Sequence, residues 1–60
     1  MTDIIGKELS EAQNHLEKHG KIMRVIEQDS KPFLGTTDYW ANRVNVKVSD
    51  GKVSAIAYVG

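Results

Sequence analysis

Apolar side chains near the start of the chain recur at helical spacing. Leu9, Ala12 and Leu16 stand three and four residues apart, and mostly charged or polar residues lie between them. This is the pattern of an amphipathic helix with one buried face. We therefore predict a helix from about Leu9 to His19, followed by Gly20 at the position where a left-handed cap is common.

Later apolar segments predict β-strands. The segment from Lys21 to Glu27 is rich in β-branched side chains and is too short for a second helix. From Arg43 to Val48 polar and apolar residues alternate, which predicts a strand with one buried face. The pair Asp50 and Gly51 then predicts a two-residue hairpin turn, because both central residues of a type I′ turn need positive φ. The last strand should run from about Lys52 to Tyr58.

A short apolar segment, Ile4 and Ile5, precedes the helix and is interpreted as a strand fragment. Together these elements predict an α+β fold in one domain over residues 1–60, with a single helix packed on a small mixed β-sheet. A strand, a helix and a strand in succession normally make a right-handed crossover between parallel neighbours. The hairpin then adds an antiparallel pair at the end of the sheet.

The segment from Gln28 to Ala41 shows no periodicity. It is longer than the usual connection of about 4 to 6 residues, and such long loops are usually functional or disordered. The polar stretch from Gln28 to Lys31 is typical of disorder. A flexible linker has no need of large apolar side chains, however. Four of them lie in this segment: Phe33, Leu34, Tyr39 and Trp40. We therefore predict a long exposed binding loop from about Asp29 to Ala41.

Composition limits the classes of function. The 60 residues include no cysteine, which excludes disulfides, thiolate metal sites and a cysteine nucleophile. Eight Lys plus Arg balance eight Asp plus Glu, so broad electrostatic attraction to nucleic acid or to an anionic membrane is not expected. Binding to nucleic acid is a lesser alternative, through a stacking platform of Tyr39, Trp40, Arg43 and Lys47.

The first residues contain neither a basic leader nor a long apolar run. No signal peptide or membrane span is therefore expected. On this pattern the chain is either cytoplasmic as written or a processed secreted form.

No pattern of catalytic residues is found, and the chain is not expected to be an enzyme. Ser10 and Ser30 have no histidine in a recognisable arrangement, and no glycine-rich phosphate loop implies a cofactor. His15 and His19 have the i,i+4 spacing of zinc ligands but lack an obvious third ligand. A solvated helix face, with His19 partly packed, is favoured over a metal site.

Several segments in order along the chain resemble one known family. The segments "IIGKELSEA", "TTDYWANRVNV", "DGKV" and "YVG" are similar to the potato type I serine protease inhibitors, which include the barley chymotrypsin inhibitor and microbial elastase inhibitors. The resemblance extends from Ile4 to Gly60. It implies a potato inhibitor I-like domain whose substrate-like loop lies in the active-site groove of a protease.

The resemblance also implies which residues contact the protease. The scissile bond is placed between Thr37 and Asp38, with Thr37 in the primary specificity pocket. A small β-branched residue there suits a subtilisin-like or elastase-like enzyme, whereas trypsin needs a cation. Leu34 could fill a secondary apolar pocket. The protease-binding residues are then Leu34, Gly35, Thr36, Thr37, Asp38, Tyr39 and Trp40.

Three residues outside the loop are implied to support it. Arg43 matches an arginine of the family that reaches from the following strand to the residues beside the scissile bond. Its guanidinium can hold Asp38 and the region of Thr36, while the carboxylate of Gly60 holds it from the other side. Asn45 stands where the plant inhibitors have a second supporting arginine. That change removes a charged contact, as does Trp40 in place of a further loop arginine.

The roles of the two aromatic residues remain open on the sequence. Trp40 could contact a partner or cover the sheet, and for Tyr39 packing on the sheet is favoured. The resulting hypothesis is a monomeric inhibitor of a serine endopeptidase, with no nucleic-acid or membrane partner and no metal or cofactor. The alternative is a non-inhibitory protein-binding module that uses the same loop.

Overall fold

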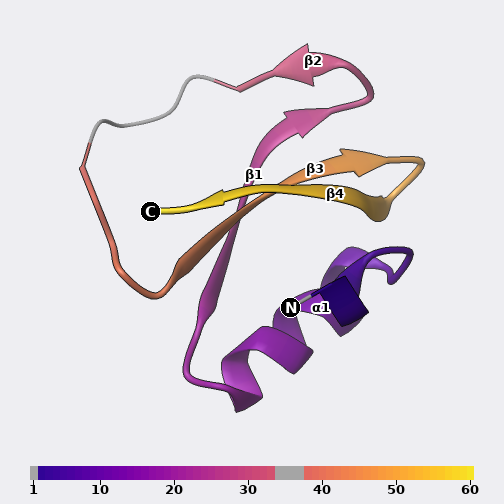
Figure 1. Ribbon diagram of the computed structural model, residues 1–60. Helices are drawn as coiled ribbons and strands as arrows, with labels where there is room; N and C mark the ends of the chain where they lie inside the picture. The colour runs from indigo at the N-terminus through magenta and orange to yellow at the C-terminus, as the bar shows by residue number, and fades with distance from the viewer. Residues whose placement is uncertain (1, 34–37) are drawn as a thin grey trace.

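The computed structural model describes residues 2–33 and 38–60. It confirms the predicted fold class, since one helix packs on a small mixed four-stranded sheet (Figure 1). The elements in chain order are η1 (Thr2–Ile4), α1 (Leu9–Lys18), β1 (Ile22–Gln28), β2 (Lys31–Pro32), β3 (Arg43–Ser49) and β4 (Lys52–Val59).

The sheet has the strand order β2-β1-β3-β4. β1 and β3 are parallel, and β3 and β4 form the antiparallel hairpin expected at the end of the sheet. Between the parallel strands β1 and β3 the chain passes through β2 and then residues 33–42. β1 and β3 are the two central strands of the sheet, and both contribute to the site described below.

The helix and the final hairpin lie close to their predicted positions. α1 ends at Lys18, one residue before the predicted end, and Gly20 has the left-handed φ of 71° that its place after the helix requires. In the β3–β4 turn, Asp50 and Gly51 have φ of 53° and 73°, as a type I′ turn needs.

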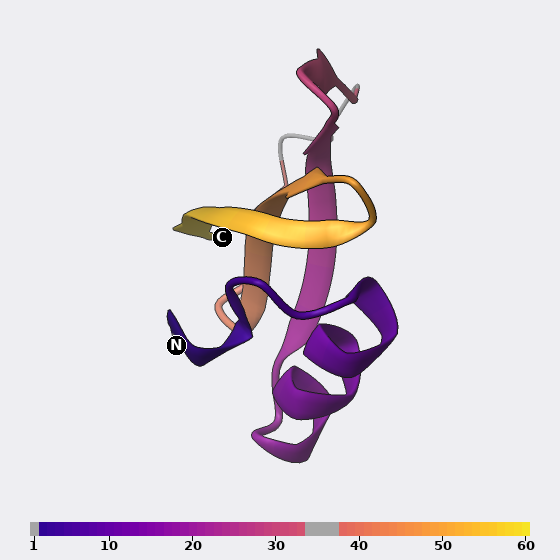
Figure 2. The same cartoon turned by 90° about the vertical axis from the view of Figure 1, so that its right-hand side faces the viewer.

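The N-terminal strand fragment was predicted wrongly. Thr2–Ile4 is a short 3-10 helix, and the side chain of Ile4 is fully buried under the sheet. The chain then runs beside β4, where the amide of Gly6 donates to Val53 O at 2.8 Å and the amide of Val53 donates to Lys7 O at 3.0 Å (Figure 2). Of the two adjacent isoleucines, Ile4 thus belongs to the core and Ile5 is 46% exposed, and Ile4 ends a 3-10 helix instead of lying in a strand.

The polar stretch at the end of β1 was also interpreted wrongly. Instead of being disordered, it makes a two-residue turn between β1 and β2, with φ of 49° at Asp29 and 68° at Ser30. Asp29 Oδ1 accepts a hydrogen bond from the amide of Asp50 at 3.0 Å, so the two turns are joined. Asp29 to Pro32, predicted as the start of the long loop, instead form the β1–β2 turn and β2 itself. Residues 34–37 of the predicted loop lie outside the described residues.

The core lies between α1 and one face of the sheet. It consists of Ile4, Ala12, Leu16, Val44, Val46, Val48 and Val53. Ala12 and Leu16 share a face of the helix, and the three valines of β3 alternate along one face of the strand. The apolar residues that recur at helical spacing in α1 thus pack with the apolar residues that alternate in β3, and together they form one apolar layer.

Candidate functional site

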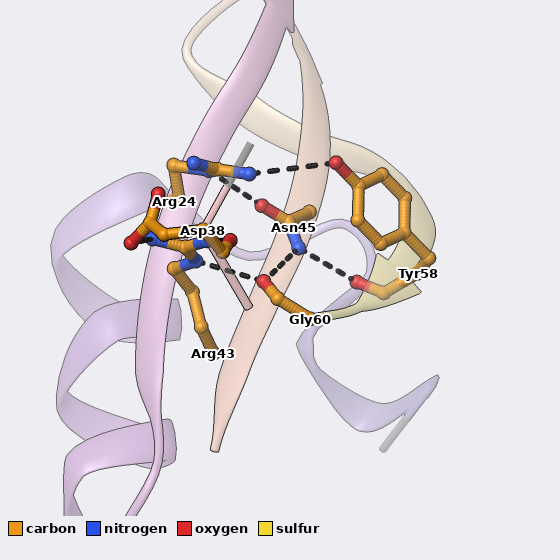
Figure 3. Close-up of polar contacts among 6 residues, drawn as sticks. All are labelled: Arg24, Asp38, Arg43, Asn45, Tyr58 and Gly60. Carbon is orange, nitrogen blue, oxygen red and sulfur yellow. Dashed lines mark hydrogen bonds and ion pairs between the residues drawn. The ribbon is translucent and has the colours of Figure 1, made fainter. Parts of the chain in front are cut away.

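The opposite face of β3 is buried as well, although its side chains are polar. Arg43 and Asn45 alternate with the core valines and so point away from α1. Arg43 is 6% exposed and Asn45 is 0% exposed. The prediction that β3 has only one buried face was therefore wrong. Polar groups buried this deeply need hydrogen-bond partners, and both residues have them (Figure 3).

Arg43 joins the connection between β2 and β3 to the end of the chain. Its Nη2 donates to the backbone oxygen of Asp38 at 2.7 Å, and its Nη1 lies 3.4 Å from Asp38 Oδ2. On its other side, Nε donates to the backbone oxygen of Gly60 at 2.8 Å. One guanidinium thus contacts both residues that the resemblance placed around it, Asp38 and Gly60. Its expected reach to Thr36 lies outside the described residues.

The geometry suits a rigid contact better than an ordinary surface ion pair. A planar guanidinium with five donors can satisfy several acceptors at fixed angles, and hydrogen bonds with a charged partner are worth about 1.5–3 kcal/mol each. Exposed pairs, by comparison, contribute about 0–1 kcal/mol. Since Arg43 is almost fully buried, its short bonds to Gly60 O and Asp38 O belong to the first kind, whereas its 3.4 Å contact with the half-exposed Asp38 carboxylate is closer to the second.

Asn45 adds a second connection to the same chain end. Its Nδ2 donates to the backbone oxygens of Tyr58 at 3.2 Å and Gly60 at 3.0 Å. The oxygen of Gly60 therefore accepts hydrogen bonds from both Asn45 and Arg43. Gly60 is the point where the two side chains of β3 meet.

Arg24 completes this group, and the sequence analysis did not identify it. It stands on β1 opposite Asn45 in the parallel register, and its Nε donates to Asn45 Oδ1 at 2.7 Å. Its Nη2 lies 3.4 Å from the hydroxyl of Tyr58. The asparagine that was expected to remove a charged contact is thus bound to a guanidinium from the neighbouring strand. The signal in the sequence was a lone arginine within the apolar segment from Lys21 to Ile26.

The aromatic residues beside Asp38 are largely exposed. The side chain of Tyr39 is 73% exposed, so the favoured packing on the sheet is wrong, although its ring lies close to Gly60. Trp40 is 49% exposed, and the guanidinium carbon of Arg43 lies 5.2 Å from its ring centroid. One part of Trp40 therefore packs on Arg43 by a cation–π contact, while the rest faces solvent.

The histidines lie on the helix, away from this group. His15 Nε2 is 2.7 Å from Asp3 Oδ2, and the two imidazole rings are 4.8 Å apart. His19 is exposed and His15 is the partly buried one, the reverse of the expected packing. Among the described residues no group of three His, Cys, Asp or Glu side chains is placed to hold a metal ion.

Comparisons with known proteins leave the geometry as the guide to function. No protein-family model matches the chain, and neither a curated protein nor a solved structure matches it significantly. Across residues 2–33 and 38–60, none of the helices has the length and apolar character needed to cross a membrane. The candidate site is accordingly the hydrogen-bonded group of Arg24, Asp38, Arg43, Asn45 and Gly60.

Proposed function

We propose that this protein is a reversible inhibitor of a serine endopeptidase, of the potato type I kind, and that it binds the protease as a substrate-like ligand. The observation that supports this most is the attachment of Asp38. A buried guanidinium holds both the backbone oxygen and the carboxylate of Asp38, and the same guanidinium is fixed on Gly60. The resemblance places Asp38 directly after the scissile bond.

Fixing Asp38 has a clear consequence for a substrate-like ligand. A segment that already has its bound shape loses little conformational entropy when it enters the active-site groove. The protease serine would attack the carbonyl carbon of Thr37, and the amino group released would be that of Asp38. Because Arg43 keeps Asp38 in place, this amino group stays beside the acyl-enzyme and can attack it again, restoring the peptide bond and freeing the serine.

The side chains around the proposed scissile bond indicate the class of protease. Thr37 would enter a primary pocket that accepts small or branched side chains, as in subtilisin-like and elastase-like enzymes, and Leu34 would enter a second apolar pocket. On the other side of the bond, Tyr39 and Trp40 have much of their ring surface exposed. Aromatic residues of this kind often dominate the binding energy of an interface.

A panel of proteases tests the proposal. We expect inhibition constants in the nanomolar range, about −12 kcal/mol of binding free energy, for subtilisin or elastase, and none for trypsin. Thr37→Pro should abolish inhibition, while Asn14→Ala, on the exposed side of α1, should leave it unchanged. Mass spectrometry of the complex after long incubation should find one cleaved bond, Thr37–Asp38. A folded protein that inhibits no enzyme of the panel would overturn the proposal.

The exposed rings of Tyr39 and Trp40 favour one other function, a non-inhibitory protein-binding module that uses the same loop. In that case the partner would not be a protease, and peptide substrates of proteases would not compete for the binding. Double substitution of Tyr39 and Trp40 by alanine should then abolish the binding, whereas Thr37→Pro should not affect it.

A further inference from the structure

We propose that Arg24 is a positioning residue for Asp38, acting through Asn45 and Gly60. Its expected effect on inhibition rests on the function proposed above, but its effect on the free protein does not. The contacts run from Arg24 to Asn45, from Asn45 to Gly60, and from Gly60 through Arg43 to Asp38 (Figure 3).

The first step is the contact between two adjacent parallel strands. β1 and β3 place Arg24 directly opposite Asn45 on the polar face of the sheet. The hydrogen bond from Arg24 Nε to Asn45 Oδ1 is 2.7 Å long, within the short range typical of bonds with a charged donor. The contact with the Tyr58 hydroxyl is 3.4 Å long and therefore weaker. Of these two contacts, the one with Asn45 is therefore the stronger.

The second step is the orientation of the Asn45 amide. A guanidinium can only donate hydrogen bonds, and a backbone oxygen can only accept them. The amide of Asn45 must therefore turn its oxygen to Arg24 and its Nδ2 to Tyr58 O and Gly60 O. Because Asn45 is fully buried, water cannot easily replace a lost partner. Without Arg24, Asn45 Oδ1 loses its donor, and only the acceptors Tyr58 O and Gly60 O still favour the orientation that supports Gly60.

The third step transfers this orientation to Arg43. The oxygen of Gly60 accepts from Asn45 at 3.0 Å and from Arg43 Nε at 2.8 Å, so both donors share one acceptor. If Asn45 no longer holds the oxygen of Gly60, Gly60 keeps its backbone bond to Arg43 O at 2.8 Å, but its oxygen is a less firmly fixed acceptor for Arg43 Nε. The other end of the Arg43 guanidinium, which holds the backbone oxygen of Asp38, is then freer to shift. These bonds thus link Arg24 to Asp38 through Asn45, Gly60 and Arg43.

Two variants of Arg24 and one of Asn45 test this order of contacts. Arg24→Met removes the donors but keeps an unbranched apolar stem. Arg24→Lys keeps the charge, yet an ammonium at the end of a flexible chain cannot reproduce the Nε–H of the fork. Asn45→Asp keeps the acceptor for Arg24 and gains an ion pair with it, but loses both donors to the chain end. Lys52→Met, at an exposed position of β4, is the matched control for loss of a positive charge.

Two measurements separate positioning from a merely structural role. In the free protein, NMR hydrogen exchange at Arg43 Nε–H and Asn45 Nδ2 reports how firmly the group is held. With subtilisin, the rate of cleavage at Thr37–Asp38 reports the consequence. Arg24→Met should speed both by on the order of tenfold, which corresponds to about 1.4 kcal/mol. Arg24→Lys should resemble Arg24→Met in both measurements, and Asn45→Asp, which has no Nδ2, should resemble it at Arg43 Nε–H and in cleavage. Lys52→Met should resemble the unaltered protein.

The outcomes distinguish this inference from the proposed function. If the unaltered protein inhibits no protease but Arg24→Met still speeds exchange at Arg43 Nε–H, the proposed function fails and the positioning role stands. If the protein inhibits and Arg24→Met changes neither exchange nor cleavage, the positioning role is wrong and the function stands. Should Arg24→Met not fold, Arg24→Lys decides in the same way, since it retains the stem and the charge.

Discussion

Over residues 43–46 the two faces of β3 are both buried and chemically opposite. Val44 and Val46 on one face are 0% exposed, and Asn45 on the other face is also 0% exposed. The apolar face gains stability simply by removing carbon from water, at about 25 cal/mol for each Å². The polar face must first replace the hydrogen bonds that its groups made with water. Equal burial therefore does not mean an equal contribution to stability.

The polar face can instead fix the positions of the groups that it binds. An apolar layer tolerates small shifts, because dispersion and the hydrophobic effect have little directionality. A guanidinium bound to both Asp38 and Gly60 allows one arrangement only, since each donor must meet its own acceptor. We therefore infer that the helix-facing side of the sheet stabilises the fold, while the opposite side fixes residues 38–42 and the chain end.

The largest expected loss of stability is on the apolar face. Leu16 is 2% exposed, and Leu16→Ala should lower the free energy of unfolding by about 2–5 kcal/mol, measured by urea denaturation. In a domain this small such a loss brings global unfolding within reach, so subtilisin should cut the variant at many bonds. Asn14→Ala, on the exposed side of the same helix, should change stability by no more than about 0.5 kcal/mol. A Leu16→Ala protein cut at a single bond would contradict the assignment of stability to this face.

The opposite pattern is expected for Arg43→Ala. Asp38 is 46% exposed at its side chain and can be hydrated once its partner is gone, so the loss of stability should be only about 1–3 kcal/mol. Cleavage at Thr37–Asp38 should nevertheless rise by on the order of 10²-fold, because a small displacement of the reacting groups has effects of this size. Mass spectrometry should show that bond cut alone. Arg43→Lys keeps the charge but not the planar fork of donors. It should be cleaved at a rate between those of the unaltered protein and Arg43→Ala.

If Arg43→Ala instead lowers the free energy of unfolding as much as Leu16→Ala does, the inference that one face stabilises the fold and the other fixes positions is wrong. Urea denaturation and mapping of the cleaved bonds on the same samples decide this. The polar face would then contribute to the free energy of unfolding as much as the apolar face does.

The sequence predicted those features that depend on neighbouring residues. The period of Leu9, Ala12 and Leu16 specified the helix, and Asp50 with Gly51 specified the final turn, because each signal lies within a few residues. Arg43 was placed correctly beside Asp38, which is only five residues away. That placement came from the resemblance to the inhibitor family and not from a periodic pattern, as did the contact of Arg43 with Gly60, 17 residues away.

The errors about the polar face of β3 concern contacts between distant parts of the chain. Arg24 and Asn45 meet across 21 residues of sequence, through a parallel register that no local pattern encodes. The burial of Asn45 depends on Tyr58 and Gly60, which return from β4. The alternation of polar and apolar residues in β3 therefore indicated that the polar face is solvated, whereas the end of the chain covers that face.

The smallest effect is expected at the β1–β2 turn, which belongs to neither face. Ser30 has φ of 68°, a region that costs a residue with a Cβ about 1–2 kcal/mol, whereas glycine enters it freely. Glycine also loses more entropy on folding, by about 0.5–1 kcal/mol, so Ser30→Gly should raise the stability by about 0.5 kcal/mol. Thermal unfolding measures this, with Ser30→Val as the opposite control, because a β-branched residue strains such a turn. Cleavage at Thr37–Asp38 should stay unchanged in both variants. If Ser30→Gly slowed or speeded that cleavage, the position of Asp38 would depend on the β1–β2 turn as well as on the polar face.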